Sequence, residues 1–128
     1  MDVCLQYQSC RSLNKMKLII AIIRPTRLAS VKDALKEHGF SGITITPVKG
    51  RGSQRGTIEK YRGSEYTIDL LDKVEIKVVV EDDALEEAVK VITDNARTGE
   101  LGDGKIFVLN VEHAIRIRTE ELGSEALG

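Results

Sequence analysis

Apolar and polar residues follow two different periods in the first half of the chain. Residues 18–23 form a continuous, isoleucine-rich apolar run that ends before a proline, which predicts a strand covered on both faces. From Thr26 onward, apolar residues recur every three or four positions until Gly39, which predicts a helix and its C-terminal stop. Residues 42–48 alternate apolar with small polar side chains, as in a strand with one buried face. The predicted order for this half is β-α-β.

The second half repeats this order. Residues 74–80 alternate as a strand, and residues 105–109 form another apolar run after a glycine-rich turn. Between them, Asp82-Asp83 and Glu86 are similar to an N-cap and its capping-box partner, so we expect a helix to begin there. The apolar stripe of this helix consists of Leu85, Ala88, Val89, Ile92 and Ala96. Two such units predict an α+β fold, the ferredoxin-like split βαβ sandwich with element order βαββαβ.

The connection between the two units, residues 49–72, is much longer than this fold requires. It contains four glycines and no periodicity of the kind that buries a core face. Connections of this length in compact domains are usually functional or disordered. A tolerated insertion is the alternative, but two tyrosines and several charged residues in the segment favour a functional loop.

Composition and charge narrow the class of protein. A hydrophobic content of 41% with 30% charged residues is typical of one globular domain, and the net charge of −1 provides no field for nucleic acid or membrane. No apolar run approaches the roughly 20 residues of a membrane span. Two helices can cover only one face of a four-stranded sheet, so we expect a homo-oligomer to cover the other.

Catalytic and metal-binding patterns are missing from the sequence. Cys4 and Cys10 both precede the patterned region and form no zinc-type cluster with the two histidines. There is no Ser/His/Asp set and no carboxylate pair in an evident catalytic loop, so we do not expect an enzyme. Residues 1–15 lack the apolar segment of a secretory signal, and we expect a flexible leader before a domain that starts at Met16.

Three segments contain candidate anion-binding chemistry. Residues 50–56 place three glycines among two arginines, and residues 98–105 place three glycines beside Lys105. Glycine lets backbone N–H groups approach a phosphate closely. Residues 115–118 alternate isoleucine with arginine, which in a strand sets both arginines on one side as a two-pronged phosphate ligand. The alternatives are plain turns for the loops and a solvated, salt-bridged face for the arginines.

Two longer motifs carry a resemblance to a known family. YRGSEY at residues 61–66 and TGELGDGKIF at residues 98–107 match, in order, two signatures of the PII (GlnB/GlnK-type) nitrogen-regulatory signal transduction proteins. The resemblance covers residues 16–119 and leaves residues 120–128 as a C-terminal tail. The stretches IIRPTRL and GRGSQRG are similar to archaeal GlnK-like members.

The resemblance implies a homotrimer with ATP or ADP in clefts between subunits, each beneath the base of a long T-loop at about residues 51–69. The matching nucleotide-binding positions are Gly42, Thr44, Gly50, Gly52, Ser53, Gln54, Val79, Gly102, Asp103, Gly104, Lys105, Arg116 and Arg118. Gln54 would help to hold Mg²⁺ with ATP. The effector 2-oxoglutarate would contact Gln54, Arg55, Lys73 and Gly102.

The implied function is a cytoplasmic sensor of nitrogen and energy status that acts on a partner through its T-loop. The expected partner is an ammonium transporter of the Amt type, with the membrane reached only through that transporter; nitrogenase and glutamine synthetase are alternatives. Tyr66 matches the loop tyrosine that some bacterial relatives uridylylate. A small trimeric enzyme acting on a nucleotide is the rival from another class.

Three positions depart from the family pattern. Ser53 stands where arginine is common, Arg55 where lysine is common, and Lys77 where glutamate is common. Arginine and lysine present different hydrogen-bonding geometry. The resemblance therefore supports the expected nucleotide site more strongly than the expected 2-oxoglutarate site.

Overall fold

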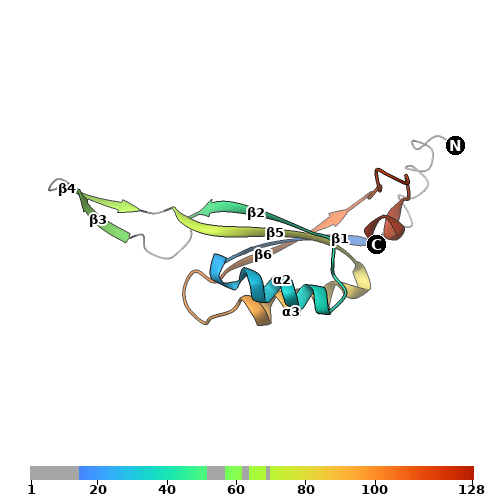
Figure 1. Cartoon of the computed structure of the whole chain (residues 1–128), viewed down its shortest axis with the longest axis horizontal. Helices are drawn as coiled ribbons and strands as arrows, with labels where there is room; N and C mark the ends of the chain where they lie inside the picture. The colour runs from blue at the N-terminus through green and yellow to red at the C-terminus, as the bar shows by residue number, and fades with distance from the viewer. Residues whose placement is uncertain (1–14, 52–56, 62–63, 69) are drawn as a thin grey trace.

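The computed structural model describes residues 15–51, 57–61, 64–68 and 70–128, and only the backbone within the two middle ranges. Two α-helices pack on one face of a four-stranded sheet, and a separate two-stranded hairpin projects from one end of the domain (Figure 1). The strands are β1 (Met16–Ile23), β2 (Ile43–Gly50), β3 (Thr57–Tyr61), β4 (Ser64–Ile68), β5 (Leu71–Glu81) and β6 (Gly104–Val111). The helices are η1 (Pro25–Arg27), α2 (Leu28–Glu37), η2 (Asp82–Ala84), α3 (Leu85–Ala96) and η3 (Gly123–Leu127).

The sheet has the strand order β2-β5-β1-β6, and all its neighbouring strands are antiparallel. Both β-α-β units contribute one central and one edge strand, with their helices side by side beneath the sheet (Figure 1). This arrangement confirms the predicted ferredoxin-like α+β fold.

The core lies between the sheet and the two helices. Alternate residues of β1, including Ile19 and Ile23, are almost fully buried, as is Ile76 on β5. They meet Leu35 of α2 and Ile92 of α3, both with no exposed surface. Burying a side chain of this size contributes about 1.5–3 kcal/mol, so this layer fixes the sheet that positions the loops at its ends.

The C-terminal end of the first helix follows the sequence prediction, whereas α2 begins at Leu28, after the 3₁₀ turn η1, and not at Thr26. Gly39 has φ of 87°, a left-handed conformation that favours glycine, and it ends α2 as expected. The N–H of Phe40 donates to the carbonyl of Leu35 at 2.8 Å, and the N–H of Gly39 donates to Lys36 at 3.0 Å. These two bonds form a Schellman motif, which satisfies carbonyl groups that the helix leaves unpaired.

The predicted cap of the second helix is wrong. Asp82 and Asp83 lie in η2, one turn before α3, and no side chain caps either helix start. The Asp82 carboxylate instead accepts from Lys17 Nζ at 2.7 Å. Glu86 lies in the first turn of α3, where a negative charge is favourable beside the helix dipole. The extra 3₁₀ turn shifted the acidic residues out of the capping position.

The long connection contains more regular structure than its sequence pattern predicts. β2 extends to Gly50 and β5 begins at Leu71, so the segment between them is shorter than the predicted residues 49–72. Within it, β3 and β4 pair as an antiparallel hairpin. The sequences of these strands, TIEKY and SEYTI, show no strict apolar alternation, because a hairpin outside the main sheet has no core face to bury.

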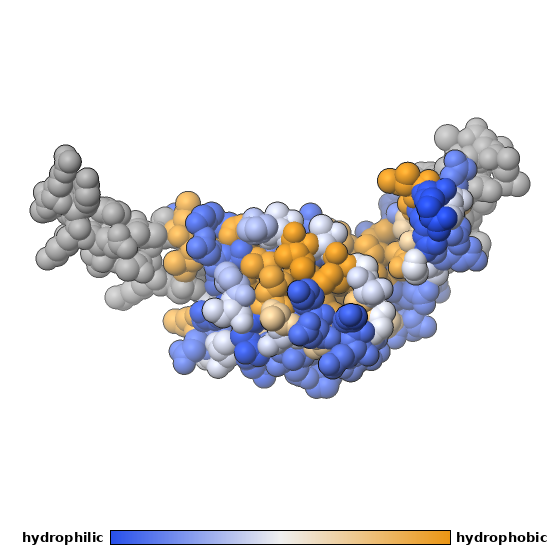
Figure 2. Space-filling view, in the orientation of Figure 1, coloured by the Kyte–Doolittle hydropathy of each residue, from blue (hydrophilic) through white to orange (hydrophobic). Residues whose placement is uncertain are grey.

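The face of the sheet opposite the helices carries exposed apolar residues. Phe107 and Leu109 of β6 are 49% and 47% exposed, and they pair across the sheet with Ile20 and Leu18. In the view of Figure 2, which has the sheet above the helices, apolar residues also gather at the middle of the domain. β1 is therefore covered on only one face within a single chain. No helix in the described part of the chain is long and apolar enough to cross a membrane.

Candidate functional site

The loop between α3 and β6 is tied together by one carboxylate. Oδ2 of Asp103 accepts from the backbone N–H groups of Thr98 and Gly99, both at 2.9 Å. The Thr98 hydroxyl donates to Oδ1. The hydroxyl and backbone bonds from Thr98 hold the pKa of Asp103 well below its usual range. The three glycines of this loop therefore belong to an ordered structure rather than a loose turn.

Because the pKa of Asp103 is depressed on folding, its charge stabilises the loop above the ordinary carboxyl pKa, and this contribution is lost only as the pH falls through the lower folded value. We expect amide protection of residues 98–105, corrected for intrinsic exchange, to stay constant from about pH 7 to about pH 4 and to decline below that. Asp103→Asn should weaken the protection across this whole range. A wild-type decline that begins above pH 5 would contradict this assignment.

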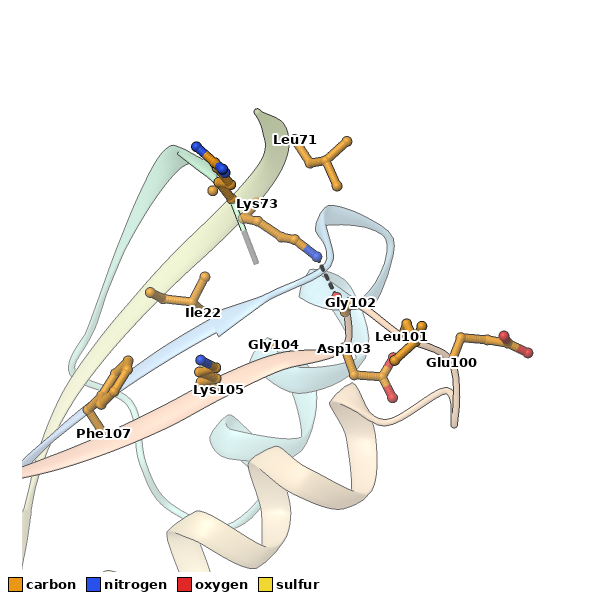
Figure 3. A pocket seen from close by; sticks show the side chains of 12 residues that line it. Ile22, Leu71, Lys73, Glu100, Leu101, Gly102, Asp103, Gly104, Lys105 and Phe107 are labelled. Atoms are coloured by element: carbon orange, nitrogen blue, oxygen red, sulfur yellow. Dashed lines mark hydrogen bonds between the residues drawn. The ribbon is translucent and has the colours of Figure 1, made fainter. Parts of the chain in front are cut away.

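Two cations hold residues 98–105, which we call the glycine loop. One lies on β5 and the other directly after β1. Nζ of Lys73, on β5, donates to the carbonyl oxygen of Gly102 (Figure 3). Arg24, which follows β1, donates to Asp103 and to the carbonyl of Leu101. Desolvation, together with the nearby Arg24 charge, lowers the pKa of Lys73.

A cavity of about 470 Å³ opens beside this loop, within the size range of small-molecule sites. β1, β5 and β6 all contribute to its wall, and Gly50 lies at its rim where β2 ends. Figure 3 shows Lys73 reaching toward the loop above Lys105, while Glu100 points away from it. The predicted site residues gathered here are Gly50, Lys73, Gly102, Asp103, Gly104 and Lys105. Lys105 is exposed and forms no ion pair within the described ranges.

A second group of predicted residues lies elsewhere. Gly42 and Val79 line a groove that residues of η3, including Leu127, close from the other side. Thr44 is exposed on β2 and pairs with Lys77. Val79 pairs with Leu18 on β1, whereas the glycine loop enters the sheet beside Ile23, so the two groups are separated by about 17 Å along the strand.

The predicted strand at residues 115–118 is wrong. β6 ends at Val111, and Ile115 forms only an isolated bridge with Leu122. The chain turns back because Arg116 binds the tail: it donates to Glu121 Oε1 at 2.9 Å, to the Glu125 carbonyl at 2.8 Å, and to the Gly128 carbonyl.

The two arginines therefore differ in their surroundings, contrary to the predicted two-pronged arrangement. Arg116 is half-buried against the tail, whereas Arg118 is exposed in a turn and forms no ion pair within the described residues. Ile117, which a strand would set on the side opposite the arginines, is 95% exposed. A period-2 pattern cannot reveal this, because the partners of Arg116 come from later in the chain.

Several predicted residues lie outside the described side chains. Gly52, Ser53, Gln54 and Arg55 are outside the described residues altogether, and Tyr66 is described only as backbone within β4. The atypical Lys77 is described, and it pairs with Glu75 at 3.2 Å, away from the cavity wall.

Sequence reasoning also missed part of the site. Ile22, Leu71 and Phe107 line the cavity, and Arg24 holds its loop. The place of Arg24 follows only from the strand register of the folded sheet: Ile23 pairs with Gly104, so the next antiparallel position sets Arg24 opposite Asp103.

Comparisons with known proteins agree with this fold. The family model described as Nitrogen regulatory protein P-II matches residues 16–121. The chain belongs to the PII family. A P-II protein from Mesorhizobium japonicum is 54% identical over 112 residues, covering 88% of this chain and 100% of the relative. The P-II 1 protein of Methanothermobacter thermautotrophicus is 50% identical over 115 residues, covering 90% of this chain and all of the relative.

A solved structure of Arabidopsis thaliana PII bound to citrate is similar as well, with a TM-score of 0.73 and 37% sequence identity. It covers 89% of this chain and 91% of its own. The family and its relatives are nitrogen regulatory proteins, so this PII protein is a regulator rather than an enzyme, as the sequence predicted. Bacterial and archaeal relatives match at similar identity, so the GlnK-like, archaeal assignment stays a prediction.

Proposed function

We propose that this PII protein binds ATP or ADP in clefts between the copies of a homotrimer and signals the bound ligand to a partner through its T-loop. The observation that carries the proposal is the separation of the predicted nucleotide residues into two groups. The glycine loop and its lysines line one cavity, and Gly42, Thr44 and Val79 lie some strand positions away. Neighbouring copies would bring one group of each chain against the other group of the next.

The residues of the cavity suit a polyphosphate. Lys105 is exposed beside a loop whose backbone is held in place by Asp103, and Lys73 lies above it. Ammonium groups and glycine N–H donors are the groups that bind phosphate oxygens. Arg118, which is exposed, would add a guanidinium from the neighbouring copy. Arg116 would contribute only with the rearrangement of its tail contacts.

The second ligand of the proposal is a keto-dicarboxylate such as 2-oxoglutarate. Among the side chains expected to contact this effector, that of Lys73 is described in the structure. Its ammonium group would leave the Gly102 carbonyl and bind a carboxylate of the effector. The citrate bound to the plant relative shows that a PII protein can take a polycarboxylate. With ATP, Mg²⁺ would be held by phosphate oxygens and Gln54. The metal would supply a positive centre that draws the carboxylate toward the phosphates.

The same cavity gives ligands a route to the T-loop. Gly50 and Leu71, which line it, are the residues at which the chain leaves and rejoins the sheet around the β3–β4 hairpin. A ligand that contacts this base changes the relative energy of hairpin orientations, and a partner that binds one orientation responds. We propose an Amt-type ammonium transporter as that partner and the cytoplasm as the location; nitrogenase and glutamine synthetase are the alternatives.

The open face of the sheet is the surface through which the copies of the proposed trimer would pack. Phe107 and Leu109 are about half exposed in one chain, and their pairing partners on β1, Ile20 and Leu18, are partly exposed beside them. A contiguous apolar face of this kind marks an interaction surface in a regulatory domain of this size. Packing these faces against one another in a closed ring would bury all of them.

Calorimetric titration tests the ligand proposal. ATP and ADP are added to the full chain with and without Mg²⁺, and 2-oxoglutarate is added to each complex. We expect nucleotide binding with Kd in the micromolar range or tighter, about −8 kcal/mol, and 2-oxoglutarate binding only with Mg²⁺ and ATP. Absence of heat with both nucleotides would contradict the proposal. Sustained ATP turnover that Lys105→Ala abolishes would favour the enzymatic rival.

Partner capture then tests the regulatory proposal. Detergent-solubilised ammonium transporter is passed over immobilised protein with ATP or with ADP. We expect retention to differ between the two nucleotide states and to be lost when residues 57–68 are replaced by a short glycine-serine linker. Equal retention of the transporter by this loopless variant would exclude the T-loop as the contact.

A further inference from the structure

Arg24 is fixed in place by its neighbours in the chain. It follows the last residue of β1, a central strand, and precedes Pro25. Proline disfavours a helical conformation in the residue before it, and Arg24 has extended φ and ψ of −66° and 138°. Its carbonyl accepts from the N–H of Arg27 at 3.0 Å. The backbone of Arg24 is therefore held in one conformation, which fixes the direction in which its side chain leaves the strand.

The guanidinium of Arg24 bridges two points of the glycine loop. Nε donates to Asp103 Oδ1 at 3.0 Å, and Nη2 donates to the carbonyl oxygen of Leu101. The first contact engages the carboxylate that ties the loop to Thr98 and Gly99. The second fixes a peptide plane. A planar trans peptide points its N–H opposite to its C=O, so the N–H of Gly102 is directed away from Arg24.

Arg24 and Lys73 act on the loop from different positions. Lys73 lines the cavity and holds the carbonyl of Gly102, whereas Arg24 does not line it. A ligand in the cavity can take the Lys73 ammonium from that carbonyl. The Arg24 guanidinium itself is not part of the lining, although its acceptors, Asp103 and the Leu101 carbonyl, belong to lining residues, so Arg24 acts on the loop from outside the cavity.

We propose that Arg24 is a positioning residue that pre-orients the backbone N–H groups of the glycine loop for phosphate without touching the ligand. The proposal deepens the nucleotide site and rests on the proposed function for its ligand. Preoriented donors bind more tightly because their ordering is complete before the ligand arrives. Arginine suits this role, since its planar fork can hold an oxygen of a carboxylate and a backbone carbonyl together.

The chain offers a matched control. Arg27 lies three residues further on, and its Nε donates to a carbonyl oxygen, that of Asn95, at 2.8 Å. It is also partly buried, but it makes no described contact with residues 98–105. Arg24→Gln and Arg27→Gln therefore remove the same charge and, in each case, a hydrogen bond to a backbone carbonyl. Arg24→Gln also removes the ion pair with Asp103, and only this variant should loosen the glycine loop.

The experiment compares wild type, Arg24→Gln, Arg24→Lys and Arg27→Gln. Amide exchange is measured without ligand, and ATP affinity is measured by calorimetry. We expect Arg24→Gln to speed exchange in residues 98–105 and to weaken ATP binding about tenfold, the effect of one charge-assisted hydrogen bond. Arg27→Gln should leave both unchanged. Arg24→Lys should recover only part of the affinity, because one ammonium cannot reproduce the fork.

A further readout separates positioning from general stability. The Arg24 charge helps to lower the pKa of Lys73, so nitrogen NMR of the lysine ammonium should show this pKa rising in Arg24→Gln and not in Arg27→Gln. Wild type that binds no ATP would overturn the proposed function, while the exchange data would still test the loop. Equal exchange and equal ATP affinity in the two glutamine variants, or full recovery by Arg24→Lys, would overturn the role of Arg24.

Discussion

Replacing Gly104 with alanine is expected to lower the free energy of unfolding by about 3 kcal/mol and to abolish nucleotide binding. Gly104 has φ of 108°, and a Cβ built there would lie 1.7 Å from the carbonyl oxygen of Ile22. That oxygen belongs to a central strand and cannot move aside as a flexible side chain would. The start of β6 would have to shift, and the neighbouring Lys105 and the rest of the glycine loop would shift with it. Urea unfolding and ATP calorimetry measure the two effects.

Gly99→Ala is the matched control. Gly99 lies in the same loop with a similar φ of 90°, but a Cβ added there would meet nothing within 4 Å beyond the adjoining residues. Alanine at this position carries only the left-handed backbone cost of about 1–2 kcal/mol. If Gly104→Ala proves no more damaging than Gly99→Ala, the close approach of the loop to β1 is not what holds the site together.

The second large effect is expected for Phe107→Glu. A glutamate on the open sheet face leaves a single chain folded, since Phe107 is 49% exposed there. In the proposed trimer the same carboxylate would be buried without a partner, which costs several kcal/mol at each interface. Light scattering after size exclusion should therefore show monomers in place of trimers.

Ala29→Glu provides the comparison for this change. Ala29 is exposed on α2, in the helix layer and not on the open sheet face. A carboxylate there stays in water both in the single chain and in the trimer. We expect this variant to remain trimeric. Persistence of the trimer in Phe107→Glu would show that copies associate through another surface.

The sequence pattern predicts the fold because the core is regular. The alternation that buries Ile76 on β5 and the helical spacing that buries Leu35 and Ile92 are local signals, and together they specify two β-α-β units. Gly39 could be predicted as a helix end because one residue decides that conformation. The glycine loop could be predicted as part of a site because its glycines exceed the needs of a turn.

Features that depend on distant partners could not be predicted in this way. Arg116 is turned away from a strand by acceptors five to twelve residues further along the chain. The capping role expected of Asp82 failed because a 3₁₀ turn separates it from the start of α3, and its carboxylate pairs with Lys17 of β1 instead. Arg24 joins the site through the register of two strands, which becomes visible only after the sheet is assembled. The nucleotide, 2-oxoglutarate and transporter assignments remain predictions that the family membership supports.

Mixed trimers test whether each nucleotide site combines groups from two copies of the chain. Lys105→Ala removes a cation of the glycine loop, and Arg118→Ala removes the exposed arginine expected from the neighbouring copy. Each variant alone should bind ATP at least about tenfold more weakly than wild type while remaining a trimer.

The two variants are then unfolded together, refolded as mixed trimers and titrated with ATP. A site shared between copies predicts that about one site in four, built from an intact loop and an intact arginine, regains wild-type affinity. Mixed trimers that bind no more tightly than the separate variants would place both residues in a site within one chain, and would exclude a site shared between copies.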